Sequence, residues 1–156
     1  MEPISNEIQR KEAISYIEKL LAAMGIDTHV EDGVIGDSIA FLIRTNDAAL
    51  LIGEEGQNLQ ALNHIIKKAL EQKALFPEGQ FFVDVNDYQR RRFDELKDKA
   101  RMGAQRVRYF KKEVTLEPMS AFERRIVHMA LQEYPDISTE SVGQGVSRKV
   151  VIKPLP

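Results

Sequence analysis

The chain has 156 residues, with 22 basic and 24 acidic side chains, a formal net charge of −2 and no cysteine. This length suits one ordinary domain or two small ones, and the mixture of apolar and charged residues argues against general disorder. The absence of cysteine excludes disulfides, thiolate metal sites and cysteine nucleophiles. The charged N-terminal stretch lacks a signal-peptide core, and no apolar run is long enough to cross a bilayer, so we expect a cytoplasmic protein without membrane insertion.

Charge is divided unevenly along the chain. Residues 1–87 carry 15 acidic and 7 basic side chains, a net charge of −8. Residues 88–156 carry 9 acidic and 15 basic side chains, a net charge of +6. A basic half beside an acidic half indicates a localised site for a polyanion, although unevenly charged solvated surfaces would give the same pattern.

The first half of the chain alternates between helical and strand-like patterns. Ser5 or Asn6 can cap a helix whose apolar residues recur at helical spacing until Gly25 ends it. The runs IDTHVE and SIAFLIRT predict two strands, separated by DGVIGD with its two turn-favouring glycines. A short helix, AALLI, stops at Gly53, and a second helix with one apolar face follows; FPEG then breaks the chain and QFFVDVN predicts a strand. The two helices around the turn should cover one face of a sheet.

The turn between these two helices reads Gly53-Glu54-Glu55-Gly56. Glycines permit sharp turns and the close approach of a ligand. The element order over residues 6–86, together with LIGEEGQNLQALNHI, resembles a type II KH domain, whose Gly-x-x-Gly loop clamps a nucleic-acid backbone. Here both variable positions are glutamates, and a like charge at phosphate distance costs about 1–4 kcal/mol. We therefore expect a KH-type loop that clamps phosphate weakly, and a structural or protein-binding role stays open.

The composition changes at Tyr88. The stretch YQRRRFDELKDKARMGAQRVRYFKK holds 10 basic and 3 acidic residues. Its apolar residues from Phe93 to Phe110 can form one stripe, which predicts a long basic amphipathic helix, loosened at Gly103. The helix would pack partly on one domain and show its arginines to solvent.

The last segment predicts a small α/β domain. EVTLEP reads as a short strand and MSAFERRIVHMALQEY as a helix, in which Ser120 and Glu123 fit a capping box. ISTESVG and RKVVIKP follow as two strands joined by GQG. Within the helix, Arg124 and His128 lie one turn apart on the same face, a spacing that ordinary solvated helices also show.

The capped helix, the preceding EPMS and the final SRKVVIKP together resemble the R-3-H domain, which is named for arginine, three residues and histidine, and binds single-stranded nucleic acid. The resemblance covers residues 112–154 and implies that Arg124 and His128 are the signature pair. The basic neighbours of this pair are Arg125, Arg148, Lys149 and Lys153.

A KH-like unit, a basic helix and an R-3-H unit in this order resemble the bacterial Jag family, the SpoIIIJ-associated RNA-binding proteins. Many members carry a further N-terminal domain, which we expect to be missing because the first helix starts almost at Met1. The resemblance implies an α/β fold of the α+β kind. Its parts would be a KH-like domain at 1–87, a basic connecting helix at 88–111 and an R-3-H-like domain at 112–156.

The favoured function is binding of single-stranded RNA in a bacterial cytoplasm, with regulation of RNA fate as the implication of the family. Arg124 and its basic neighbours would neutralise phosphates, and His128 could donate a hydrogen bond or stack on a base. No catalytic residue, metal or cofactor is expected, because no Walker-type loop, Gly-x-Ser-x-Gly or metal-ligand spacing occurs. Two alternatives stay open: a protein-interaction adaptor that uses the acidic KH-like surface, and single-stranded DNA binding. The arginines that would extend the electrostatic track are Arg90, Arg91, Arg92, Arg101, Arg106 and Arg108.

Overall fold

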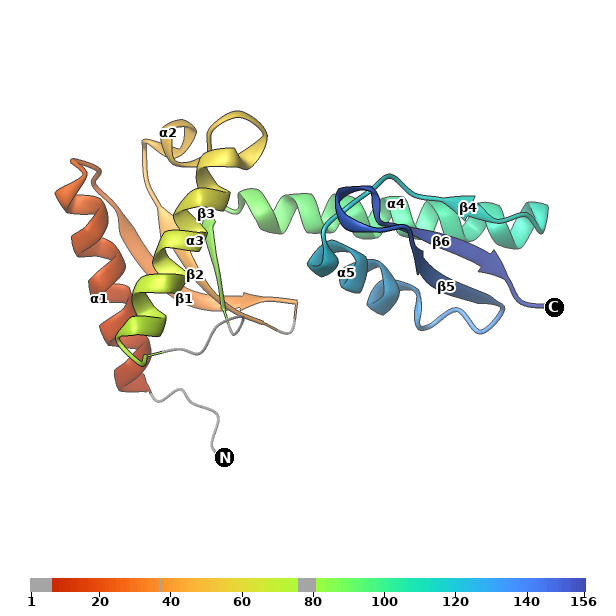
Figure 1. The fold of residues 1–156 in the computed structure, drawn as a ribbon, viewed down its shortest axis with the longest axis horizontal. Coiled ribbons are helices and arrows are strands. Elements are labelled where there is room, and N and C mark those ends of the chain that lie inside the picture. Colours follow the sequence, from red (N-terminus) through yellow and green to blue (C-terminus); the bar gives the residue numbers. More distant parts are fainter. Residues whose placement is uncertain (1–6, 37, 76–80) are drawn as a thin grey trace. The chain divides into compact units, whose positions relative to one another are not determined.

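The computed structural model describes residues 7–36, 38–75 and 81–156 (Figure 1). Its contacts divide the chain into two compact units, Met1–Arg90 and Arg91–Pro156. The predicted cap at Ser5 or Asn6 and the predicted break at 76–79 lie outside the described residues. In the described segments, no helix is both long and apolar enough to span a bilayer.

The first unit has the element order predicted from the sequence. It contains α1 (Glu7–Ala23), β1 (His29–Ile35), β2 (Ser38–Arg44), α2 (Ala48–Ile52), the 3-10 turn η1 (Glu54–Gly56), α3 (Gln57–Gln72) and β3 (Phe81–Val85). The strands form one sheet in the order β1-β2-β3, in which β1 and β2 are antiparallel and β2 and β3 are parallel. Residues 32–35, which we predicted as part of a turn, belong to β1, because this strand continues to Ile35.

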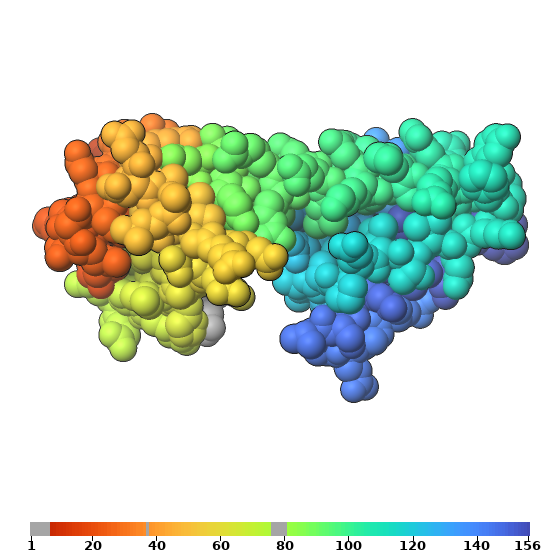
Figure 2. Space-filling view, turned by 90° about the horizontal axis from the view of Figure 1, so that it is seen from above, coloured from red at the N-terminus to blue at the C-terminus, as the bar shows by residue number. Residues whose placement is uncertain are grey.

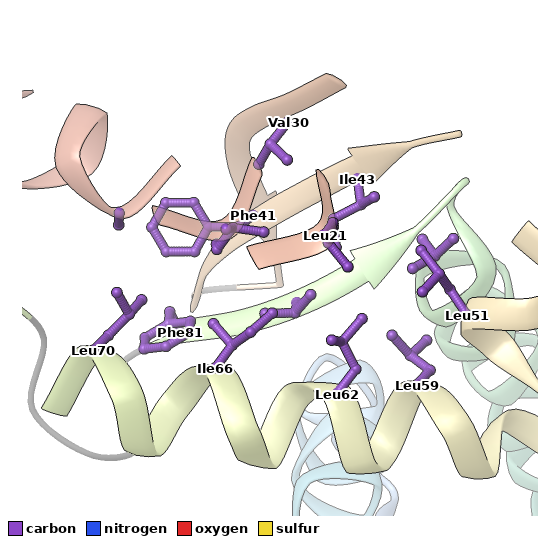
Figure 3. Close-up of a cluster of buried hydrophobic side chains, with 14 of the residues drawn as sticks. Leu21, Val30, Phe41, Ile43, Leu51, Leu59, Leu62, Ile66, Leu70 and Phe81 are labelled. Carbon is purple, nitrogen blue, oxygen red and sulfur yellow. The ribbon is translucent and has the colours of Figure 1, made fainter. Parts of the chain in front are cut away.

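The core of the first unit lies between the helices and one face of this sheet (Figure 3). Successive side chains of a strand point to opposite faces, and the parallel register places Phe41 and Ile43 of β2 on the same face as Phe81 of β3. The rings of Phe41 and Phe81 meet edge to face, with their centroids 5.4 Å apart. Helix α3 contributes a buried stripe at helical spacing: Leu59, Leu62, Ile66 and Leu70.

The second unit contains a three-stranded antiparallel sheet in the order β4-β6-β5. Its elements are the greater part of α4 (Tyr88–Phe110), then β4 (Val114–Thr115), α5 (Ala121–Leu131), β5 (Ile137–Val142), the 3-10 turn η2 (Gly145–Ser147) and β6 (Lys149–Pro154). The long basic helix, the capped helix and the final two strands are therefore present as predicted, whereas the first strand is only two residues long.

Helix α4, which we predicted as a separate connector over 88–111, supplies part of the second core. Ala100 and Val107 of α4 are fully buried and belong to one cluster with Val127 of α5 and Ile152 of β6. The second unit accordingly begins at Arg91 and not at residue 112. Helix α4 is basic on its exposed side and buries its small apolar residues in the core of the second unit. It is therefore a structural part of this unit.

Two details of α4 differ from the sequence prediction. The helix is not loosened at Gly103: a Cβ atom there would lie 2.9 Å from Cδ1 of Ile152, so the glycine lets α4 pack closely against β6. The buried stripe ends at Val107, and Phe110 is 61% exposed. The chain leaves the helix at Lys111, whose φ is +58°. The last two residues of α4, Tyr109 and Phe110, are exposed, and the blue-green part of the chain around position 110 lies at the surface in the space-filling view (Figure 2).

Candidate nucleic-acid interface

Helix α5, which carries the predicted signature pair, begins with a complete capping box. The Ser120 side chain accepts a hydrogen bond from the Glu123 amide at 3.2 Å, and the Glu123 carboxylate accepts one from the Ser120 amide at 2.8 Å. This pair of bonds satisfies two amide groups that a helix start would otherwise leave free. It fixes where α5 begins and therefore which way Arg124 and His128 point.

Arg124 ties α5 to the segment that follows β4. Its Nη1 donates a hydrogen bond to the carbonyl oxygen of Met119 at 2.9 Å. The amide of Met119 in turn donates to the carbonyl oxygen of Arg148 at 3.1 Å. These two bonds place Arg124 at the end of the sheet where the β5–β6 hairpin turns. A guanidinium carries five N–H donors in a planar fork, so the bond to Met119 leaves donors for a phosphate.

His128 is held by β5 at both ring nitrogens. Its Nδ1 lies 2.6 Å from Oγ1 of Thr139, and its Nε2 lies 3.0 Å from Oγ of Ser141. A neutral imidazole donates at one nitrogen and accepts at the other, and a hydroxyl can do either, so both tautomers satisfy these bonds. Burial lowers the pKa of His128 below its ordinary value of 6.5, and the charge of Arg124 lowers it further. At neutral pH His128 is therefore a fixed, uncharged ring.

The two predicted lysines of β6 point away from the signature pair. Val150 and Ile152 are buried in the core, so Lys149 and Lys153, which alternate with them, point to the opposite face of the sheet. On that face Nζ of Lys153 lies 2.6 Å from Oε2 of Glu140 in β5. This pair raises the pKa of Lys153 and lowers that of Glu140. The structure does not bring these lysines together with Arg124 and His128.

The two predicted arginine neighbours, Arg125 and Arg148, are exposed. Arg148 directly follows the hairpin loop at 143–147, which requires glycine at its start. Gly143 has a φ of +91°, and a Cβ atom there would lie 3.2 Å from the carbonyl oxygen of Ser147. The tight loop thus positions Arg148 at the same end of the sheet as Arg124.

The predicted arginine track on α4 is mostly engaged in ion pairs with nearby carboxylates. Nε of Arg108 lies 2.7 Å from Oδ2 of Asp136 and lowers the pKa of that carboxyl group. Among the described residues, Arg106 makes no ion pair, and Arg91 is exposed. The paired arginines are Arg90 with Asp87, Arg92 with Glu123, Arg101 with Asp98 and Arg108 with Asp136.

The backbone of the Gly-x-x-Gly turn in the first unit favours glycine at both of its glycine positions. Gly53 has φ +71° and ψ −175°, a region open almost only to glycine, and a Cβ atom there would lie 2.6 Å from the side chain of Asn58. Gly56 adopts the left-handed conformation with φ +81°. Between them Glu54 and Glu55 are exposed. The corner is a tight turn in its own right, and it presents two carboxylates.

Sequence reasoning missed Thr139 and Ser141, the two hydroxyl residues that fix His128. The sequence does contain a signal for them: in the strand ISTESV, every second residue lies on the same face, which places Thr139 and Ser141 on the face of Ile137. Polar side chains on the face that carries a core isoleucine need partners, and the histidine of the neighbouring helix supplies them.

Known proteins resemble this chain over most of its length. The family model of the R-3-H domain matches residues 94–154, which include most of α4, and this confirms the predicted R-3-H unit. The RNA-binding protein KhpB of Bacillus subtilis is 33% identical over 147 residues, which are 91% of this chain and 69% of the relative.

Two further relatives carry the same name. KhpB of Clostridium symbiosum is 31% identical over 148 residues, 94% of this chain and 66% of the relative. KhpB of Lactiplantibacillus plantarum is 29% identical over 149 residues, 95% of this chain and 46% of the relative. The chain thus spans between about half and about two thirds of the length of these two relatives. The match to the Bacillus subtilis protein, extensive in both chains, confirms the resemblance seen in the sequence: the chain belongs to the KhpB family of RNA-binding proteins.

Proposed function

We propose that the chain binds single-stranded RNA, and that the binding is centred on its second unit. The observation that carries this proposal is the arrangement of Arg124 and His128, a cation and a neutral ring on one helix face, both fixed by hydrogen bonds. Groups that are ordered before binding lose little conformational entropy when the ligand arrives. The R-3-H match over this unit and the naming of the relatives as RNA-binding proteins support the same conclusion.

Each residue of the site has a chemical role in this proposal. The free guanidinium N–H groups of Arg124 bind a phosphate, and exposed Arg148 neutralises a second phosphate of the same strand. The neutral ring of His128 offers a flat surface to a base without adding charge. Because most of these contacts go to the backbone and to a base face, the site tolerates many sequences.

The wider role that we propose is consistent with this chemistry. A protein that holds single strands without altering them can regulate RNA fate in a bacterial cytoplasm, and we propose no catalytic step. Among the described residues, no group of three or more histidine, aspartate or glutamate side chains could hold a metal ion. The alternative is the adaptor role, in which the acidic first unit would bind a protein partner.

A binding experiment on the whole chain tests the proposal. The affinity for labelled single-stranded RNA, single-stranded DNA and duplex is measured by fluorescence anisotropy over a range of salt concentrations. Arg124→Ala should weaken RNA binding and flatten the dependence of log K on log salt by roughly one unit at most. Lys149→Ala is the matched control, because it removes a cation from the opposite face of the sheet and should change binding less.

Each contrary result has a definite meaning. Wild-type affinity in a folded Arg124→Ala variant would remove the signature pair from the interface. Tighter binding of single-stranded DNA than of RNA would favour the single-stranded DNA alternative, because the 2′-hydroxyl of RNA would then contribute no favourable contact. No binding of any nucleic acid at low salt would favour the adaptor role.

A further inference from the structure

Two aromatic side chains lie exposed on the last turn of α4. Tyr109 is 81% exposed and Phe110 is 61% exposed, and their ring centroids are 4.8 Å apart at an interplanar angle of 78°. Neither ring contributes to the core of the second unit. Large aromatic side chains are usually buried, and an exposed apolar patch indicates an interaction surface.

The chain around this aromatic pair is strongly basic. From Lys99 to Lys112 there are six basic side chains and no carboxylate. Arg106 precedes the two rings by three and four positions, so it lies next to both on the helix surface. Lys111 and Lys112 follow directly and are exposed. Cations that flank exposed aromatic rings match a ligand with a charged backbone and flat bases.

A groove of about 480 Å³ leads from this surface towards the Arg124 site. It lies between α4 and the returning segment at 114–119, and both Arg106 and Met119 line it. Met119 is also the residue that accepts the hydrogen bond of Arg124. Along α4 the lining extends from Arg92 to Arg106, about 21 Å at a rise of 1.5 Å per residue. The groove therefore lies between a neighbour of the aromatic pair, Arg106, and the hydrogen-bond partner of Arg124, Met119, within one unit.

The charged residues that line the groove determine how a single strand would be oriented in it. Lys99 and Arg106 can pair with phosphates, whereas Glu95 and Glu117 repel them. The other two charged residues of the lining, Arg92 and Glu123, lie 3.9 Å apart as an ion pair. Carboxylates accept hydrogen bonds from the exocyclic amino groups of bases, as glutamate does with cytosine. A single strand in the groove would turn its bases towards the glutamates and its phosphates towards the two cations.

We propose that the last turn of α4 is a base-stacking platform for single-stranded RNA, on which Tyr109 and Phe110 hold bases while Arg106 and the two following lysines contact phosphates. The groove leads the same strand from this platform to Arg124. The inference rests on the proposed function and adds a second subsite to it. The cationic flanks favour a polyanion over a protein partner, and docking of a protein is a separate outcome of the test.

Tyr109→Trp provides a direct readout, because the chain contains no tryptophan. The whole chain with this substitution is titrated with an unstructured oligonucleotide of adenosine and uridine. Binding is followed in the same samples by the anisotropy of a label on the RNA. The tryptophan fluorescence should be quenched as RNA binds, because a base stacks on the indole ring. Met24→Trp, at a 57% exposed position of the first unit, is the matched control and should not be quenched.

Affinity measurements separate stacking from other contacts. Phe110→Ala should weaken binding about fivefold or more, the lower end of the effect of losing one base–aromatic stack. The salt slope should stay the same, because stacking releases no counterions. Phe110→Leu keeps an apolar side chain without an aromatic face and should lose affinity as alanine does.

Two results would overturn the platform. Wild-type RNA affinity in Phe110→Leu would show that the position provides an apolar surface of the kind a protein uses. Bound RNA without quenching of Tyr109→Trp would show that no base reaches the ring. If Arg124→Ala still weakens binding in that case, only the platform fails, whereas a wild-type chain that binds no RNA would refute the proposed function itself.

Discussion

Replacing Thr139 with valine tests how the ring of His128 is fixed. Valine keeps the β-branched shape and the strand preference of threonine, but it lacks the hydroxyl that lies 2.6 Å from Nδ1 of His128. One ring nitrogen then loses its partner, whereas Ser141 still lies 3.0 Å from the other nitrogen. The substitution therefore removes one hydrogen bond and leaves the rest of the site in place.

The expected loss of stability follows from this geometry. An intramolecular hydrogen bond contributes a net stabilisation of about 0.5–1.5 kcal/mol, and a buried group left without a partner costs about 1–3 kcal/mol. The His128 ring is only partly buried, so water can reach the freed nitrogen and reduce the cost. We expect the free energy of unfolding of the second unit to fall by about 1 kcal/mol. RNA affinity should fall as well, because the ring is no longer held in one orientation.

The assay is a urea titration followed by the NMR signals of amides in β5 and β6, which report on the second unit alone. Thr115→Val, the same substitution at an exposed position of β4, is the matched control and should stay within about 0.5 kcal/mol of the wild type. A double-mutant cycle with His128→Ala should give a coupling energy of about 1 kcal/mol. Strictly additive effects, or a loss no larger than that of the control, would refute the role assigned to the hydroxyl.

Three further predictions concern the turn and the pH dependence. Gly53→Ala should destabilise the first unit by about 2–4 kcal/mol in chemical denaturation, because the backbone conformation is strained for alanine and the added methyl group overlaps the side chain of Asn58. Gly25→Ala is the control: its φ is also positive but the space around it is open, so the loss should be about 1 kcal/mol. Equal losses in the two variants would contradict this explanation. Replacing Glu54 and Glu55 with lysine should raise RNA affinity at low salt if the turn faces the RNA, and unchanged affinity in a folded variant would leave it a structural or protein-binding role. The stability of the second unit should decline as the pH falls below about 6.5, because the unfolded chain then binds a proton that the partly buried His128 resists; denaturation at several pH values should show a flatter curve for His128→Gln.

Features coded by neighbouring residues could be predicted from the sequence. The capping box of Ser120 and Glu123 places the start of α5, and helical spacing then puts Arg124 and His128 on one face. Glycine at position 25 ends α1 with a φ of +81°. Each of these signals acts within a few residues, so the chain order alone contains it.

Partners far apart in the sequence could not be predicted in this way. His128 meets Thr139 only because α5 packs on β5, and Lys153 meets Glu140 only through the register of two strands. The face of the sheet to which the Lys149 side chain points could not be predicted either. The run Val150-Val151-Ile152 is apolar on both sides of the strand, so its pattern does not show which side faces the core.

The ion pairs of α4 also determine how RNA binding will respond to salt. A phosphate that binds a free cation releases small ions into solution, which gives a slope of about −0.7 per phosphate for single strands. Arg92, Arg101 and Arg108 already lie near a carboxylate of their own unit. A phosphate that takes one of these arginines frees a tethered carboxylate, whose negative charge retains a cation beside the strand and reduces the net release of ions. The slope of log K against log salt should therefore correspond to fewer phosphate contacts than the number of basic residues in α4 suggests. Each acidic partner within the unit takes the place of a counterion from solution.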